Sequence, residues 1–310
     1  MLYGREDIIK PKHWLIFILL GTIWSASFLW IKIAVQEIGP FTLVAFRVLF
    51  GMLSAGALTL FMRAGWPRDR ATWLTFATLG ITSIAVPFIL ISWGEQTIDS
   101  AVASILNATT PLFTIVIAHI FLHDDRITVP KVLGLLVGFV GVVVLLSQDI
   151  SDNHNSIGGQ AAVIVAAIFY AASSVFARIK TEHVPGLVRG AAPHVSAMLV
   201  MWIAAPIFER PFKIPSMPIT WIALLWLGIL GSGLALIMWY YLLHEIGPTR
   251  TTLVTYIFPL GGMILGVVFL DERLSWQLVS GAILIISSIA VVNWQPKPLK
   301  QRARASRSKK

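Results

Sequence analysis

The chain has 310 residues, of which 56% are hydrophobic and only 13% are charged, and its mean hydropathy is +0.79. A water-soluble domain needs more charge to cover its surface, so this composition excludes an ordinary soluble protein and indicates a bilayer as the solvent. The sequence contains no cysteine, which excludes a disulfide framework and a thiolate metal site.

Ten apolar runs follow one another along almost the whole chain. A transmembrane helix needs about 20 predominantly apolar residues, and runs of this kind cover residues 14–35, 41–62, 73–93, 101–122, 129–147, 158–178, 187–208, 219–243, 249–270 and 275–294. The connections are only a few residues long, so no soluble domain fits between the runs. The sequence therefore predicts an all-α integral membrane protein with ten transmembrane helices.

The basic residues predict how this protein is oriented. With a cytoplasmic N-terminus, 19 of the 24 Lys and Arg residues fall on the inner side and three on the outer side, while Lys32 and Arg47 lie inside spans. Cytoplasmic segments are enriched in Lys and Arg, so we expect a multi-pass protein of the cell (inner) membrane with both termini in the cytoplasm.

Seven of the basic residues lie in the tail at 295–310, after the last apolar run. Basic clusters beside a membrane span are typical of contact with anionic lipid headgroups. We therefore expect membrane lipids as partners of the tail, and no nucleic acid.

The two halves of the chain repeat one another. At an offset of 148 residues Pro111 aligns with Pro259. At an offset of 147 residues "DDRIT" at 124–128 aligns with "DERLS" at 271–275. Five spans is an odd number, so the second half must enter the membrane in the opposite direction. Two inverted five-helix repeats, at 14–147 and 158–294, are the architecture of secondary transporters, whose binding site lies between the repeats.

The paired segments "TPLFTIVIAHIFLHDDRIT" (110–128) and "FPLGGMILGVVFLDERLS" (258–275) resemble the duplicated EamA domain of the drug/metabolite transporter superfamily. The resemblance covers nearly the full chain. It implies a membrane carrier for small metabolites, commonly an exporter of amino acids or related compounds. The acidic–Arg pair at 125–126 and 272–273 is interpreted as a structural feature of a tight turn, not as a substrate site.

Polar and aromatic stripes in paired spans supply the candidate binding residues. In the first and sixth spans, residues three or four apart share one helix face, and lipid offers no partner to their polar groups. The fourth and ninth spans carry polar residues beside a mid-span proline, and the third and eighth add residues near their ends. The candidates are Trp24, Ser25, Phe28, Ser92, Trp93, Asn107, Thr110, Tyr170, Ser174, Tyr240, Thr255 and Tyr256. Helix packing, or an interfacial aromatic belt for the residues near span ends, is the alternative for each.

The mid-span prolines, Pro111 and Pro259, each remove one main-chain hydrogen bond and free the carbonyl four residues earlier. Both are candidate hinges, with a passive kink as the alternative.

Four further residues are candidates for a charge or proton role, because ionisable groups inside spans are costly: Lys32, Arg47, His119 and His194. Lys32 can also extend to the interface. Arg47 lies deeper, so an acidic residue or a substrate carboxylate is its expected partner. The histidines can equally be packing residues.

The sequence contains no nucleotide-binding loop, zinc-protease motif or nucleophile elbow. We therefore expect no cofactor, no metal and no enzymatic activity. The prediction is a secondary transporter that works by alternating access, with export favoured. An uptake permease, a channel-like facilitator and a lipid-handling membrane protein are the alternatives.

Overall fold

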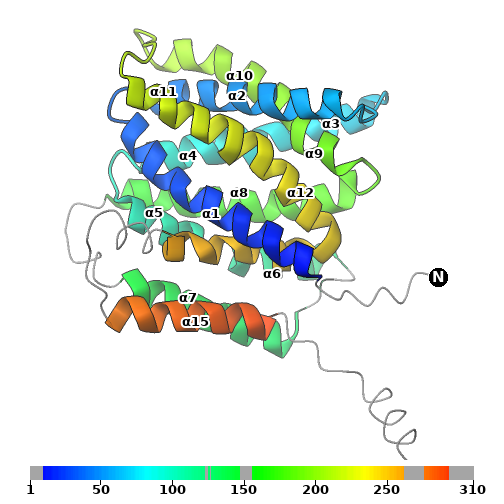
Figure 1. Cartoon of the computed structure of the whole chain (residues 1–310), viewed down its shortest axis with the longest axis vertical. Coiled ribbons are helices and arrows are strands. Elements are labelled where there is room, and N and C mark those ends of the chain that lie inside the picture. Colours follow the sequence, from blue (N-terminus) through cyan, green and yellow to red (C-terminus); the bar gives the residue numbers. More distant parts are fainter. Residues whose placement is uncertain (1–9, 123–124, 126, 147–155, 262–275, 293–310) are drawn as a thin grey trace, which may run out of the picture.

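The computed structural model describes residues 10–122, 125, 127–146, 156–261 and 276–292. Within these residues all regular structure is helical. Seven helical segments are long and apolar enough to cross a membrane, and they lie together as one bundle (Figure 1). The basic tail and the second acidic–Arg pair lie outside the described residues.

The helices of the first half follow the predicted spans closely, except that the third and fourth spans are each divided into shorter elements. These elements are α1 (Pro11–Ala34), α2 (Pro40–Phe61), α3 (Arg70–Leu79), the π-helix η1 (Gly80–Ala85), α4 (Val86–Gly94), α5 (Ser100–Asn107), α6 (Thr110–Phe121) and α7 (Val129–Leu146).

The second half repeats this order, including a π-helix inside the eighth predicted span. Its elements are α8 (Ile157–Thr181), α9 (Gly186–Ala191), α10 (Pro193–Phe208), α11 (Pro218–Leu225), the π-helix η3 (Trp226–Leu234), α12 (Ala235–Ile246), α13 (Pro248–Thr252), the 3₁₀-helix η4 (Leu253–Tyr256) and α15 (Trp276–Val292). The predicted ninth span is described only as far as residue 261.

Proline and glycine residues explain where several of these helices begin and where the chain departs from α-helical geometry. A proline stands in the first turn of α1, α2 and α11, where its missing N–H has no intrahelical partner to lose. Pro87 is the second residue after η1. Because it lacks an N–H, it cannot donate to the carbonyl four residues earlier, so one main-chain hydrogen bond of the helix is missing there. In η3, Gly228, Gly231 and Gly233 give the backbone similar freedom.

Gly134, Gly138 and Gly141 let α7 approach α15 closely. Small residues spaced three or four apart lie on one helix face and allow two backbones to come together. A Cβ atom at Gly141 would lie 3.0 Å from the carbonyl oxygen of Gly281 and 3.0 Å from the amide nitrogen of Ile285. Figure 1 shows α7 and α15 side by side at one edge of the bundle.

Residues at the ends of helices and in the connections contact one another in two groups. In one group, Glu209 accepts hydrogen bonds from the main-chain N–H groups of Phe41 and Thr42, at 2.7 and 2.9 Å. In the other group, the His13 ring lies 3.4 Å from the Glu245 carboxylate. The first acidic–Arg pair belongs to this second group through Asp125, which forms an ion pair with Lys131 and accepts from the Thr249 amide at 3.1 Å. Asp125 thus stabilises a helix start, as expected for a residue with a structural role.

Candidate solute-binding cavity

A cavity of about 80 Å³ lies in the interior of the bundle, between elements of both halves. This volume is enough for about five water molecules or a small organic group. Its lining is mostly apolar and aromatic, with a small number of polar side chains: Trp24, Ser27, Phe28, Ile31, Arg47, Ser83, Phe88, Ile91, Asn107, Thr110, Tyr170, Ser173, Ser174, Ala177, Leu236, Trp239, Tyr240, Thr255 and Phe258. An apolar site with a few convergent polar groups is the usual form of a small-molecule site.

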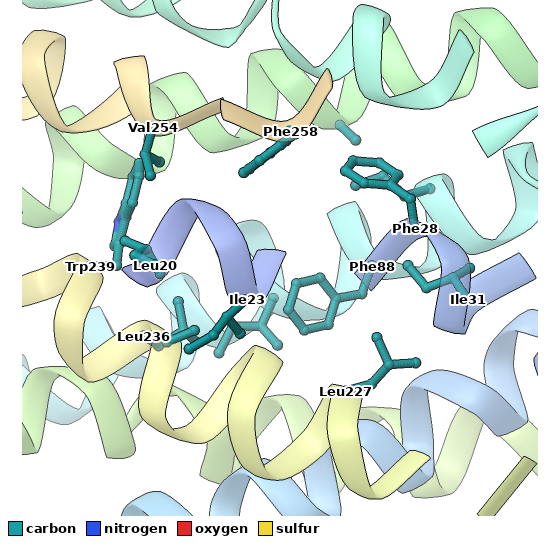
Figure 2. Packing of buried hydrophobic residues seen from close by; sticks show 14 of the residues in the cluster. Leu20, Ile23, Phe28, Ile31, Phe88, Leu227, Leu236, Trp239, Val254 and Phe258 are labelled. Atoms are coloured by element: carbon teal, nitrogen blue, oxygen red, sulfur yellow. The ribbon is translucent and has the colours of Figure 1, made fainter. Parts of the chain in front are cut away.

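The aromatic walls are held by contacts between α1 and the second half. The Trp24 ring lies 5.3 Å from the Trp239 ring, and the Phe28 ring lies 5.6 Å from the Phe258 ring, both between centroids. The Trp24 indole N–H donates to the Gly231 carbonyl of η3 at 2.8 Å, which fixes the orientation of that ring. Figure 2 shows Phe28, Phe88 and Phe258 directed toward the same space beside α1.

Arg47 is the charged residue of this lining, and its residue surface is only 4% exposed. Its Nε donates to the Ser232 hydroxyl at 2.9 Å, and Ser232 in turn donates to the Leu227 carbonyl at 2.9 Å. Its Cζ lies 3.6 Å from the centroid of the Phe88 ring, which places the cation over the ring face. The π-helix η3 therefore supplies the hydroxyl that holds Arg47 at the cavity.

The hydroxyl groups of the serine and threonine residues in the lining mostly donate to main-chain carbonyls three or four residues earlier in the chain. Ser174 donates to the Tyr170 carbonyl at 2.6 Å, and Thr255 donates to the Thr252 carbonyl at 3.0 Å. Thr110 donates to the Asn107 carbonyl at 2.6 Å, which is the carbonyl that Pro111 leaves without a main-chain donor. By contrast, the buried side-chain Oδ1 of Asn107 has no hydrogen-bond partner among the described residues.

Eight of the twelve predicted binding residues line this one cavity. They are Trp24, Phe28, Asn107, Thr110, Tyr170, Ser174, Tyr240 and Thr255. Their convergence from the first, fourth, sixth, eighth and ninth predicted spans is the arrangement that the paired stripes indicate.

The other four predicted binding residues lie outside the lining. The Ser25 hydroxyl donates to the Thr22 carbonyl at 2.9 Å, and the Tyr256 hydroxyl donates to the Leu135 carbonyl of α7 at 2.9 Å. Ser92 is fully buried away from the cavity, whereas Trp93 is 47% exposed on the outside of the bundle.

Of the four residues predicted to have a charge or proton role, Arg47 lines the cavity and the other three do not. The Lys32 ammonium donates to the carbonyls of Glu95 and Ile98, just beyond the end of α4, at 2.8 and 2.9 Å. His194 is fully buried, with Nδ1 3.0 Å from the Gly190 carbonyl. His119, in the last turn of α6, accepts from the Ile127 amide at 3.3 Å.

The candidate hinge prolines stand at helix discontinuities. Pro111 lies in the first turn of α6, directly after the break that follows α5. Pro259 is the third residue after the end of the 3₁₀-helix η4.

The sequence-based set missed several lining residues, of which Phe88, Trp239 and Phe258 are the largest. In the third predicted span Ser92 and Trp93 were selected, whereas Phe88 and Ile91 line the cavity, so the error there is one of helix rotation. A π-helix has a wider turn than an α-helix, and η1 and η3 stand just before α4 and α12. The face that these helices present could therefore not be obtained from α-helical spacing alone.

Within the described part of the chain, no group of three or more His, Asp or Glu side chains gathers as a metal site.

Comparison with known proteins places these observations in a family. The model of the EamA-like transporter family matches residues 12–147 and 157–294. An uncharacterized inner membrane transporter, YedA of Escherichia coli strain K12, is 28% identical over 83% of this chain and 82% of its own length. A probable amino-acid metabolite efflux pump of Salmonella typhimurium strain LT2 is 22% identical over 91% of this chain and 95% of its own. One solved crystal structure, 22% identical, superposes with a TM-score of 0.75 over 91% of this chain and 97% of that chain, and therefore shares the fold.

Proposed function

Because the chain belongs to the EamA-like transporter family, we propose that it is a secondary transporter that moves small organic metabolites across the cytoplasmic membrane by alternating access. The observation that carries this proposal is the interior cavity, which is lined by residues of both family-matched halves. A site at the interface of two repeats can be exposed to each side in turn when the repeats move against one another.

We propose the architecture of ten helices in two inverted five-helix repeats, with both termini cytoplasmic. The order of the described helices supports this arrangement, as do the two groups of connection contacts. The contact between Glu209 and Thr42 joins two helix ends that the span order assigns to the outer side. The contact between His13 and Glu245 joins two helix ends that it assigns to the inner side.

Amino acids or related compounds are the proposed solutes, and export is the proposed direction. The aromatic walls formed by Trp24, Trp239 and Phe258 suit a solute with an apolar body. The name of the Salmonella relative, a probable amino-acid metabolite efflux pump, is the reason to favour outward movement.

Counterflow into liposomes tests the proposal. Purified protein is reconstituted with a panel of unlabelled amino acids and related metabolites inside, and uptake of the labelled counterpart is followed. A carrier concentrates label transiently, and Trp239→Ala should weaken that uptake at least severalfold. Trp93→Ala is the matched control, since its ring lies outside the cavity, and it should leave uptake unchanged.

Three outcomes distinguish the carrier from the rival functions. Absence of counterflow for every solute of the panel, in protein that unfolds cooperatively, would overturn the carrier proposal. Single-channel currents would instead support a channel-like facilitator. Uptake into intact cells driven by an inward gradient, without any efflux, would indicate an uptake permease.

A further inference from the structure

Arg47 occupies a position where a charge needs a partner. It is the eighth residue of α2, about 10 Å along the helix from Pro40, and it is almost completely buried. Among the described residues, no carboxylate oxygen lies within 4.0 Å of its guanidinium nitrogens. An uncompensated buried charge is strongly unfavourable, so the cavity favours a ligand of opposite charge.

The nearby acidic residue does not fill this role. Glu95 interacts electrostatically with Arg47 from a longer distance, but its Oε2 accepts from the Ser100 hydroxyl at 3.0 Å. The Glu95 carboxylate is thus hydrogen-bonded to Ser100, the first residue of α5. It makes no direct ion pair with the guanidinium of Arg47.

The contacts of the guanidinium itself define which of its groups remain available. The Ser232 hydroxyl takes the Nε–H, and the Phe88 ring covers one face. No hydrogen bond from either terminal amino group is recorded to another described residue. Two parallel N–H groups held at a fixed orientation match the two oxygens of a carboxylate, which arginine binds in bidentate fashion.

We propose that Arg47 is the specificity-determining residue of this cavity and that it binds the carboxylate of the transported solute. The inference rests on the proposed transport function and narrows it to small organic acids and amino acids with an apolar body. The aromatic walls contact that body, and Asn107, with its unpartnered Oδ1, is available to a second polar group of the same solute. Ser232 acts as a positioning residue, because it orients the guanidinium without lining the cavity.

The test compares carboxylates with the corresponding amides, in which the carboxylate is replaced by an uncharged carboxamide, in the counterflow assay. L-phenylalanine, L-leucine and phenylacetate are offered as competitors beside L-phenylalaninamide, L-leucinamide and phenylacetamide, against whichever labelled panel solute shows counterflow. In the wild-type protein each carboxylate should compete at least tenfold more strongly than its amide. In Arg47→Gln this preference should fall to within about twofold, because the shorter amide side chain stays polar but lacks the positive charge and the two terminal amino groups.

Further variants distinguish recognition from folding. Ser232→Ala should reduce the carboxylate preference severalfold by loosening the guanidinium, and Arg63→Gln, an exposed arginine, should leave it unchanged. Should Arg47→Gln not fold, the wild-type preference and Ser232→Ala still decide the question. Equal competition by acid and amide in the wild type, or a preference retained in Arg47→Gln, would overturn the inference. Counterflow carried only by solutes that have no carboxylate would also overturn it and leave the transport function standing, whereas no counterflow at all would overturn both.

Discussion

Trp73 and Trp221 lie 148 residues apart and make the same hydrogen bond: each indole N–H donates at 3.0 Å to the carbonyl of the proline six residues earlier, Pro67 or Pro215. The duplication seen in the sequence therefore extends to matching hydrogen bonds near the start of the third helical segment of each half. Lys32 and Arg178 show the same relationship at the other end of that segment. Lys32 donates to the carbonyl of Glu95, and Arg178 donates to the carbonyl of His244 at 2.7 Å.

Lys32→Met should destabilise the folded protein by about 2 kcal/mol, in the range for hydrogen bonds to a charged group. The ammonium satisfies two carbonyls beyond the C-terminus of α4, where a cation is also favoured by the helix dipole. The measurement is thermal or denaturant unfolding in lipid nanodiscs. Lys32→Arg should retain most of the stability, and Lys180→Met, at an exposed position of α8, should change it by less than about 0.5 kcal/mol. Equal effects of the two methionine substitutions would contradict this prediction.

Lys32 also illustrates what sequence reasoning can and cannot provide. Span positions, the duplication and the polar stripes follow from hydrophobicity and spacing, and they led to Trp24, Tyr170 and Thr255 at the cavity. The partners of Lys32 are main-chain carbonyls in the connection between α4 and α5, and no side-chain pattern encodes them. The same holds for Arg47, whose partner Ser232 lies inside a π-helix that no α-helical periodicity predicts.

The stability of the protein at low pH should depend on Glu37. This carboxylate accepts from the hydroxyl and amide of Ser216 and from the Met217 amide, at 2.5 to 3.0 Å. The Ser216 hydroxyl first, then the Thr220 hydroxyl and the two amides lower its pKa from 4.5 to about 2. A group with a lowered folded-state pKa stabilises the protein fully above its unfolded pKa and loses that effect as the pH falls toward the folded value. The difference in melting temperature between wild type and Glu37→Gln should therefore be constant from pH 8 to about 5.5 and should shrink steadily below about 4.5. A difference that stays constant down to pH 3 would disagree with this assignment.

The contact between α7 and α15 should tolerate no added methyl group at Gly141. The Cβ of Gly141→Ala would meet main-chain atoms of Gly281 and Ile285, which cannot move aside as a flexible side chain can. Overpacking of this kind costs about 1–3 kcal/mol. Gly56→Ala is the matched control, because no atom lies within 4 Å of its added Cβ, and it should leave stability unchanged or raise it by up to about 1 kcal/mol. Unfolding of both variants under identical lipid conditions provides the comparison, and equal stability of the two would rule out tight packing at this contact.

Replacing Pro111 or Pro259 by alanine should slow transport severalfold and leave expression largely intact. Pro111 follows a break between α5 and α6, where the Asn107 carbonyl is served by the Thr110 hydroxyl and not by the main chain. Alanine restores the missing N–H, so the main chain can continue as one stiffer helix through a point that must bend if the proline is a hinge. Pro218→Ala controls for loss of a proline as such, since Pro218 stands in the first turn of α11, where an additional N–H changes little. Counterflow rates at saturating solute, divided by the amount of folded protein, measure the effect. Unchanged turnover in both hinge variants would remove the hinge proposal, because a passive kink held by Thr110 would then account for everything seen at this break.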